Sequence, residues 1–325
     1  MFYSLFYFRI VKPIWYRQKY LALLLFPFEI IYRVCIFLRK KNCKPVFFSV
    51  PVIVVGNITV GGGGKSPFVI ALSAYLTSIG YKPGIISRGY GRQVKSHAPL
   101  DVHPQDDPIN VGDEPRMIAE QTRSPVIVGS DRVCSAQYLL EKYPDCNVII
   151  SDDGLQHYRL GRTCSICLLN GEKQLGNKHC LPAGPLREPL SALSSYDIVI
   201  DRQKDASLLK THYEGFVQVR EELCVRPLDF FENQTVHVVT GIAYPESFLE
   251  KLKTLGMTCI PHLFPDHYFF SEEDISFNDD LPVVMTQKDA VKCQIFAKQN
   301  TWFLKMRFEL TPLLQQRICH FLEMP

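Results

Sequence analysis

The sequence predicts an α/β protein: a three-layer α/β/α sandwich with a second, smaller α/β domain and an N-terminal membrane-associated helix. Three observations support this prediction. Apolar, strand-like runs alternate with helical runs along most of the 325 residues, which is typical of a parallel sheet covered by helices. A glycine-rich turn follows the first of these runs, and the first 45 residues are rich in aromatic, apolar and basic side chains.

The glycine-rich turn is the most informative part of the chain. From residue 52 the sequence reads Val-Ile-Val-Val-Gly-Asn-Ile-Thr-Val-Gly-Gly-Gly-Gly-Lys-Ser-Pro, an apolar strand, a turn and a helix start in the order of a phosphate-binding loop (P-loop). Glycines allow backbone N–H groups to close around a phosphate, and the helix N-terminus adds a partial positive charge. The fit to G-x-x-x-x-G-K-[ST] is incomplete because Thr59 stands where the pattern has glycine, and a flexible loop is the alternative.

We expect this loop to bind a nucleotide in a P-loop NTPase-like fold. Lys65 would reach the β- and γ-phosphates, and the Ser66 hydroxyl would ligate Mg²⁺. The predicted nucleotide-binding residues are Thr59, Val60, Gly61, Gly62, Gly63, Gly64, Lys65 and Ser66.

The bulk composition is that of a globular protein, with 46% hydrophobic and 21% charged residues. The net charge of +3 hides an asymmetry, because basic residues dominate residues 1–45 and the rest of the chain is mildly acidic. A nucleic-acid partner is therefore not expected, and no obligatory protein partner is evident. Cys164 and Cys167 form the only C-x-x-C pair and lie in a strand-like run, which favours free thiols over a zinc site.

The N-terminal segment, residues 1–45, is predicted to hold a helix at the cytosolic face of a membrane. Residues 21–38 are apolar apart from Pro27, Glu29 and Arg33, and no small-residue cleavage site of a secretory signal follows. A spanning helix would carry two charges in the bilayer, whereas residues four apart share one helical face. Attachment to the membrane surface is favoured, with a span or packing on the protein's own core as alternatives.

The remaining chain is predicted to form two units. In residues 46–222, a P-loop kinase domain, we expect a helix over residues 67–79 and further strands near residues 84–87, 125–128, 147–151, 165–169 and 197–200. Residues 215–235 mix charged and aromatic side chains and are interpreted as a connector. Residues 223–325 would then hold the connector and the smaller α/β domain, with a helix over residues 245–255 and strands near residues 237–241, 258–260, 282–286 and 301–305. The crevice between two such domains is a common ligand site.

Two pairs of acidic residues are candidates for chemistry. Asp152 and Asp153 end an apolar run, where P-loop enzymes hold Mg²⁺, although Asp-Asp-Gly can also be a simple turn. Asp113 and Glu114 precede a helical run, and a carboxylate there could remove a proton from a substrate hydroxyl. By spacing alone, an ordinary helix N-cap is the favoured interpretation of Asp113.

Other candidate residues are weaker. Arg88 follows a strand end and Arg187 lies in a proline-rich loop, so both suit an anionic substrate, although each could belong to an ordinary surface loop. His267 could act as a base or proton relay, although a lone histidine is more often structural. Thr286-Gln-Lys-Asp289 lacks the residue between Lys and Asp that guanine recognition by N-K-x-D needs, which disfavours a GTPase.

Taken together, these segments resemble the tetraacyldisaccharide 4′-kinase family, which phosphorylates the lipid A disaccharide precursor. The matching segments are residues 55–67, 87–92, 112–115, 151–157, 181–189, 265–267 and 286–292. The resemblance implies that ATP and Mg²⁺ are used to phosphorylate the 4′-hydroxyl of a tetraacyl glucosamine disaccharide 1-phosphate lipid, giving lipid IVA. It also implies attachment to the cytoplasmic face of the inner membrane.

The resemblance implies a role for each candidate residue. Asp113 would be the base, assisted by His267, which reverses the N-cap interpretation, and Lys65 would stabilise the β- and γ-phosphates. The metal would be surrounded by Ser66, Glu114, Asp152 or Asp153, and Gln156, and the substrate's phosphate and sugars would face Arg88 and Arg187. Two positions depart from the family pattern: Gly63 replaces a usual Thr, Asn or Ser, and Gln287 replaces a usual Glu.

A membrane-associated ATPase switch of the ParA/MinD type is the main alternative. Its loop, K-G-G-x-G-K-[ST], needs a lysine at position 60, where this chain has Val60. A soluble small-molecule kinase is the other alternative, and it leaves the N-terminal segment without a membrane role.

Overall fold

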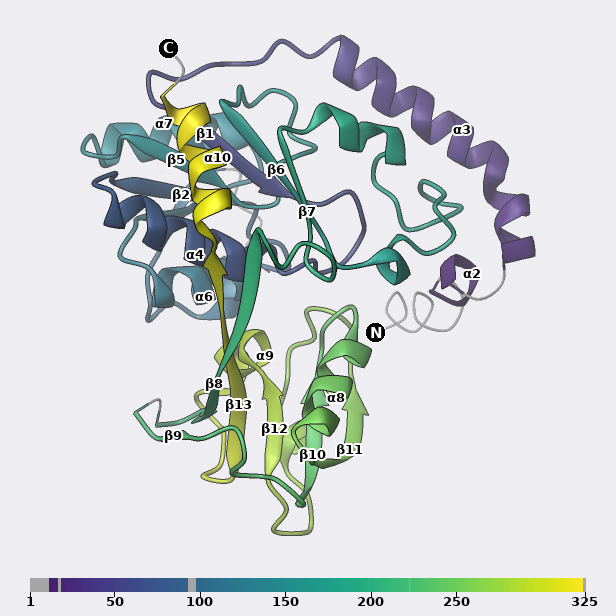
Figure 1. The fold of residues 1–325 in the computed structure, drawn as a ribbon, viewed down its shortest axis with the longest axis vertical. Helices are drawn as coiled ribbons and strands as arrows, with labels where there is room; N and C mark the ends of the chain where they lie inside the picture. Colours follow the sequence, from purple (N-terminus) through teal and green to yellow (C-terminus); the bar gives the residue numbers. More distant parts are fainter. Residues whose placement is uncertain (1–11, 17–18, 93–97, 222, 324–325) are drawn as a thin grey trace.

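The computed structural model describes residues 12–16, 19–92, 98–221 and 223–323, which form two sheets (Figure 1). Residues 1–11 of the segment predicted to be membrane-associated lie outside the described residues. Both sheets are covered by helices, as the alternation of strand-like and helical runs predicted.

The first sheet has seven strands in the order β3-β4-β2-β5-β1-β6-β7, all parallel except β3, which runs antiparallel to β4. The strands are β1 (Val52–Gly56), β2 (Pro83–Ser87), β3 (Leu100–Val102), β4 (Val126–Val128), β5 (Val148–Ser151), β6 (Cys164–Leu169) and β7 (Ile198–Asp201). Its helices are α4 (Lys65–Ser78), α5 (Pro108–Val111), α6 (Asp113–Gln121) and α7 (Arg132–Lys142), with 3₁₀ turns η2 (Glu172–Leu175) and η3 (Leu190–Ser195).

Alternate residues of β1 belong to different apolar cores, one on each face of this sheet. Ile53 packs in the same cluster as Phe68 of α4, and Val54 packs in the same cluster as Leu139 of α7. Because side chains alternate along a strand, a strand buried on both faces is a nearly continuous apolar run. The predicted three-layer α/β/α sandwich is confirmed.

The second sheet has six strands in the order β11-β10-β12-β13-β8-β9. The strands are β8 (Leu209–Gln218), β9 (Val225–Arg226), β10 (Thr235–Thr240), β11 (Thr258–Leu263), β12 (Val283–Thr286) and β13 (Thr301–Leu310), with helices α8 (Pro245–Thr254) and α9 (Gln287–Cys293) and the 3₁₀ turn η4 (Glu273–Ile275). Leu252 of α8 and Ala290 of α9 belong to different apolar clusters of this sheet.

Two long antiparallel strands, β8 and β13, run between the two cores (Figure 1). After β13 the chain forms α10 (Pro312–Leu322), whose Leu314 and Ile318 pack in the core of the first sheet. The interpretation of residues 215–235 as a connector was wrong for residues 215–218, which complete β8. The predicted domain boundary after residue 222 assigns β8, a strand of the second sheet, to the first domain, and it assigns α10, which packs on the first sheet, to the second domain. The division into domains stays a prediction.

Among the described residues, helices α2 (Lys12–Tyr16) and α3 (Lys19–Lys41) precede the first sheet, and α3 lies along the outer edge of the molecule (Figure 1). Within α3, residues 21–41 are long and apolar enough to cross a membrane, judged by length and composition. Glu29 is 2% exposed and accepts a hydrogen bond from the backbone N–H of Cys180 at 3.0 Å, with the Arg33 guanidinium at 3.7 Å. One polar face of α3 therefore holds the helix to the protein.

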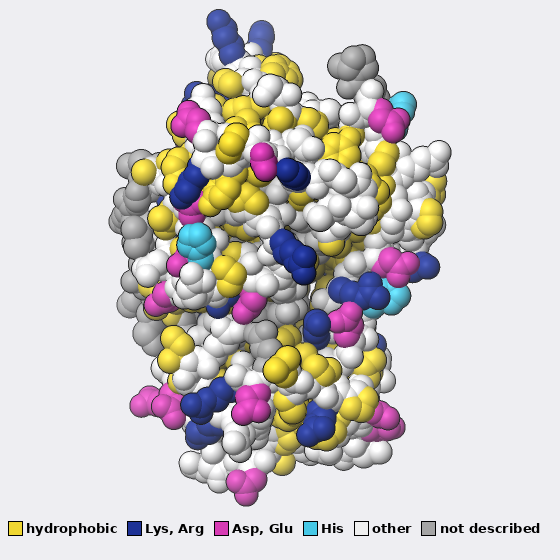
Figure 2. Space-filling model, turned by 90° about the vertical axis from the view of Figure 1, so that its left-hand side faces the viewer, with side chains coloured by type: hydrophobic (Ala, Val, Ile, Leu, Met, Phe, Trp, Pro, Cys, Tyr) yellow, Lys and Arg dark blue, Asp and Glu magenta, His cyan; other side chains and the backbone are white. Residues whose placement is uncertain are grey.

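A different face of the molecule, seen in Figure 2, carries basic and acidic side chains interspersed with apolar ones. This mixture of charges on the visible face agrees with the mildly acidic composition of the chain beyond residue 45.

Candidate active site

The glycine-rich loop connects β1 to α4 at the carboxyl edge of the first sheet. Gly61 and Gly64 have φ angles of 101° and 79°, a region that residues with a Cβ atom rarely adopt. Gly64 is the N-cap of α4, so Lys65 and Ser66 occupy its first turn, and both are buried. The start of α4 and its loop therefore have the form of an anion-binding site.

Asp152 and Asp153 follow β5, next to β1 in the sheet. Asp153 lies 3.6 Å from Lys65 Nζ and accepts two hydrogen bonds from Arg187 Nη1, each 3.0 Å long. Burial alone would raise the pKa of Asp153, but Lys65 and Arg187 outweigh it and hold the pKa well below its usual range. Asp153 is therefore an ionised carboxylate between two cations.

Asp152 has a different environment. It is 1% exposed, its Oδ2 accepts a hydrogen bond from Ser87 Oγ at 3.0 Å, and its buried Oδ1 has no hydrogen-bond partner among the described residues. Burial, together with the charges of Glu114 and Asp153, raises the pKa of Asp152 to about 7. A cation bound at the orphaned oxygen would favour the ionised form of Asp152 against burial and the charges of Glu114 and Asp153.

Asp113, at the start of α6 beside the first sheet, contacts His267, which follows β11 of the second sheet. Asp113 begins α6, and His267 Nδ1 lies 3.0 Å from both of its carboxylate oxygens. Gly112, with φ of 98°, is the N-cap of α6, so the N-cap interpretation of Asp113 was wrong. Burial would raise the pKa of Asp113, but Lys288 and the His267 hydrogen bond hold it well below its usual range.

Lys288 of α9 lies at the centre of this contact. Its Nζ is 2.9 Å from Glu114 Oε1, 3.2 Å from Asp266 Oδ1 and 3.3 Å from His267 Nε2. Since an ammonium group only donates hydrogen bonds, it favours the His267 tautomer in which Nε2 accepts and Nδ1–H donates to Asp113. The pKa of Lys288 is raised well above its usual value because three carboxylates outweigh burial.

The structure brings most of the predicted site residues to one edge of the first sheet. Gln156 donates to the Asn57 carbonyl at 3.1 Å and to Glu188 at 2.9 Å, and its own oxygen lies 3.4 Å from Arg187. The charge of Glu114 contributes to the raised pKa of Asp152. Arg88 is exposed just after β2, and the Arg187 side chain is held by Asp153 rather than directed at open space.

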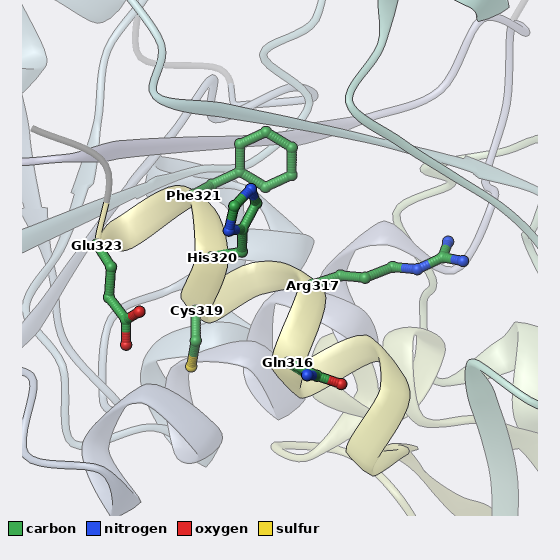
Figure 3. A pocket seen from close by; sticks show the side chains of 6 residues that line it. All are labelled: Gln316, Arg317, Cys319, His320, Phe321 and Glu323. Atoms are coloured by element: carbon green, nitrogen blue, oxygen red, sulfur yellow. The ribbon is translucent and has the colours of Figure 1, made fainter.

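The five residues proposed to surround a metal do not form a ready protein cage. Within the part of the chain that the structure describes, no group of three or more His, Cys, Asp or Glu side chains is arranged to hold a metal ion. A hollow on α10, lined by Gln316, Arg317, Cys319, His320, Phe321 and Glu323, contains none of the predicted site residues, and its side chains fan out rather than converge (Figure 3).

Sequence reasoning missed Lys288 and the side chains from outside the motif that contact the glycine-rich loop. Lys288 lies within residues 286–292, which carried part of the family resemblance, but no role was attached to it. The only signal in the sequence is a lysine two positions after an apolar strand, and its partners Glu114 and Asp266 are more than 20 positions away along the chain.

A central parallel strand followed by a glycine-rich loop, with carboxylates after the neighbouring strand, is the architecture of P-loop phosphotransferases. The model of one kinase family, described as Tetraacyldisaccharide-1-P 4′-kinase, matches residues 21–323. The chain belongs to this family, as the sequence predicted, and is therefore a kinase of lipid A biosynthesis.

Individual relatives agree with this assignment. A tetraacyldisaccharide 4′-kinase of Nitrosococcus oceani is 42% identical over 94% of this chain and 91% of its own length. One of Hahella chejuensis is 39% identical over 95% of each chain. A crystal structure described as the "apo" form of LpxK from Aquifex aeolicus in complex with ATP superposes with a TM-score of 0.76 at 30% identity, covering 93% of this chain and 99% of that one.

Proposed function

We propose that this kinase transfers the γ-phosphate of ATP to the 4′-hydroxyl of the tetraacyl glucosamine disaccharide 1-phosphate lipid. The observation that carries the proposal is the contact between buried Asp113 and His267, which Lys288 joins to Glu114. The relatives are named for this reaction, and the Aquifex aeolicus structure contains ATP.

Each proposed step is assigned to a side chain of this protein. Asp113 accepts the proton of the sugar hydroxyl as the oxygen attacks, while the Nδ1–H of His267 donates to Asp113 and orients it. Lys65 neutralises charge on the β- and γ-phosphates, because phosphoryl transfer depends mainly on positioning and charge stabilisation. Arg88, which is exposed at the end of β2, binds an anionic group of the lipid.

The residues around the loop fit a magnesium ion. Mg²⁺ is commonly bound through one or two carboxylates together with substrate phosphates and water, so a full protein cage is not needed. The orphaned Asp152 Oδ1 and the Ser66 hydroxyl are the proposed ligands, since Asp153 is engaged by two cations and Glu114 by Lys288. When bound, the ion would offset charge on the phosphate oxygens.

We place the enzyme at the cytoplasmic face of the inner membrane. Large apolar side chains of α3 are exposed, while its polar face is held to the protein. The helix would bring the protein to the surface that contains its acylated substrate.

The direct test is transfer of label from [γ-³²P]ATP to the tetraacyl disaccharide 1-phosphate in detergent micelles. Wild type is expected to label the lipid, and Asp113→Asn is expected to lose at least about 10²-fold, the usual contribution of a general base. Asp145→Asn is the matched control. The exposed Asp145 carboxylate forms an ion pair with exposed Lys82, and this substitution should leave activity unchanged.

Two outcomes would contradict the proposal. Hydrolysis of ATP without labelled lipid would favour the ATPase switch over the lipid kinase. Full activity of Asp113→Asn would exclude Asp113 as the base.

A further inference from the structure

Four consecutive carbonyl groups of the glycine-rich loop are each held by a side chain. The Val60 carbonyl accepts from Tyr244 Oη at 3.0 Å, and the Gly61 carbonyl accepts from Asn57 Nδ2 at 3.1 Å. The Gly62 carbonyl accepts from Gln174 Nε2 at 3.0 Å, and the Gly63 carbonyl lies 3.4 Å from Arg202 Nη1. The four side chains, Asn57, Gln174, Arg202 and Tyr244, are here called the carbonyl clamp.

The carbonyl clamp sets the direction of the loop's N–H groups. In a trans peptide the C=O group and the following N–H group point in opposite directions. Fixing the carbonyls of residues 60–63 therefore fixes the N–H groups of residues 61–64, which are those expected to bind phosphate. Among the described residues, no protein acceptor is recorded for the N–H groups of Gly61, Gly62 or Gly63.

Neighbouring side chains leave no room for a Cβ atom at two of the loop glycines, Gly61 and Gly64. A Cβ atom on Gly61 would lie 2.8 Å from Ala243 Cβ and 3.0 Å from Tyr244 Cε2, and one on Gly64 would meet the Arg202 guanidinium. Arg202 is partly buried and stacks on Phe308 with its guanidinium carbon 4.6 Å from the ring centroid. The contacts are thus built into packed structure rather than made by mobile surface groups.

Tyr244 also joins the loop to two distant parts of the chain. It is the residue before α8 of the second sheet, and its hydroxyl lies 2.7 Å from the hydroxyl of Tyr16 in α2. Because Tyr244 donates to Val60, the short contact is satisfied when Tyr16 donates to Tyr244. With its single proton donated to Tyr244, the Tyr16 hydroxyl only contacts the Gln174 carbonyl, 3.3 Å away, without a full hydrogen bond to it.

We propose that Tyr244 and Gln174 are positioning residues that preorganise the phosphate-binding N–H groups, and that Tyr16 acts on the loop through Tyr244. The inference rests on the proposed binding of ATP by this loop and extends it to residues outside the motif. It links the nucleotide site to the segment that leads into α3 and to the second sheet. By thermodynamic reciprocity, ATP would in turn stabilise docking of α2.

The test compares Tyr244→Phe, Tyr16→Phe and the double variant in the full-length protein. Direct binding of ATP is measured by calorimetry, and KM is measured separately for ATP and for the lipid. Tyr244→Phe is expected to weaken ATP binding about fivefold, as the loss of one hydrogen bond does, with the lipid KM unchanged. The double variant should match Tyr244→Phe alone, because Tyr16 acts through it.

Tyr143→Phe is the matched control, since its hydroxyl makes a 2.7 Å hydrogen bond to Asp101 on α7's side of the sheet, outside the loop. It should leave ATP affinity unchanged. Gln174→Glu, which replaces the donor by an acceptor, should weaken ATP binding more than Gln174→Leu does.

The outcomes separate the two proposals. A wild-type protein that fails to bind ATP would refute the proposed function. If wild type, Tyr244→Phe and Gln174→Glu all bind ATP with the same affinity, the proposed role of the carbonyl clamp is wrong. If the KM for ATP and the KM for the lipid rise equally in Tyr244→Phe, the variant has lost structure generally. This result would also contradict the proposed role of the carbonyl clamp.

Discussion

Lys288 shows how one side chain can hold two parts of this molecule together. It comes from α9 of the second sheet and contacts Glu114 at the start of α6 on the first sheet at 2.9 Å. Its exposed fraction is only 14%, and Asp266 and His267 complete its surroundings. The cation therefore compensates carboxylates that burial would otherwise make costly.

We expect Lys288→Met to lower the free energy of unfolding by about 3–5 kcal/mol at pH 7, because it leaves buried carboxylates without their cation. Burial alone would raise the pKa of Asp113 and of Asp266, but Lys288 holds both below the ordinary value of 3.8. The stability gained this way is present above about pH 4 and lost as the pH falls below it. Urea unfolding of both proteins from pH 7 to pH 2 should show a constant difference above about pH 4 that shrinks below it.

Lys204→Met is the control for this charge removal. Lys204 pairs with Glu172 at 3.1 Å, but both side chains are mostly exposed, so little change is expected. A Lys288→Met protein as stable as Lys204→Met at pH 7 would refute the role of Lys288.

At the scale of elements, apolar strands were predictable because their signal is local. The run at residues 52–56 is buried along its whole length and predicts β1 directly. No strand was predicted over β8. Its first half carries Lys210, His212 and Glu214 at alternate positions and is mostly only half buried, so it lacks a continuous apolar run. The glycine-rich loop could be predicted from its motif, whereas Asp113 was proposed as the base only through the family resemblance, and that role stays a prediction. Lys288 and Tyr244 act through contacts between distant segments that no local pattern records.

Helix α10 follows the second sheet in the chain but belongs to the core of the first. Leu314 is fully buried, and neighbouring Leu313 is 45% exposed. Leu314→Ala should therefore destabilise the protein by about 2–5 kcal/mol, whereas Leu313→Ala, the same chemical change one position earlier, should cost far less. Thermal unfolding of both variants tests this. Similar melting temperatures would contradict the packing of α10 on the first sheet.

At the scale of the whole molecule, α3 has one side held to the protein and another exposed. Tyr32 Oη donates to the Arg187 carbonyl at 3.1 Å, and Glu29 accepts from Cys180, so both side chains touch the loop that carries Arg187. Contact with a membrane would therefore occur close to the candidate active site.

The exposed apolar side chains of α3 are predicted to hold the enzyme on lipid. Leu24, Phe28 and Phe37 are 72%, 58% and 63% exposed, and burying each in the interface would contribute about 1.5–3 kcal/mol. Changing all three to Gln should reduce co-sedimentation with anionic phospholipid vesicles at least about tenfold and leave ATP binding intact. The matched control changes Leu223, Ile295 and Leu313, three exposed apolar residues outside α3, to Gln. If both triple variants bind vesicles as wild type does, α3 is not the membrane contact; if both lose binding, the contact is not specific to α3.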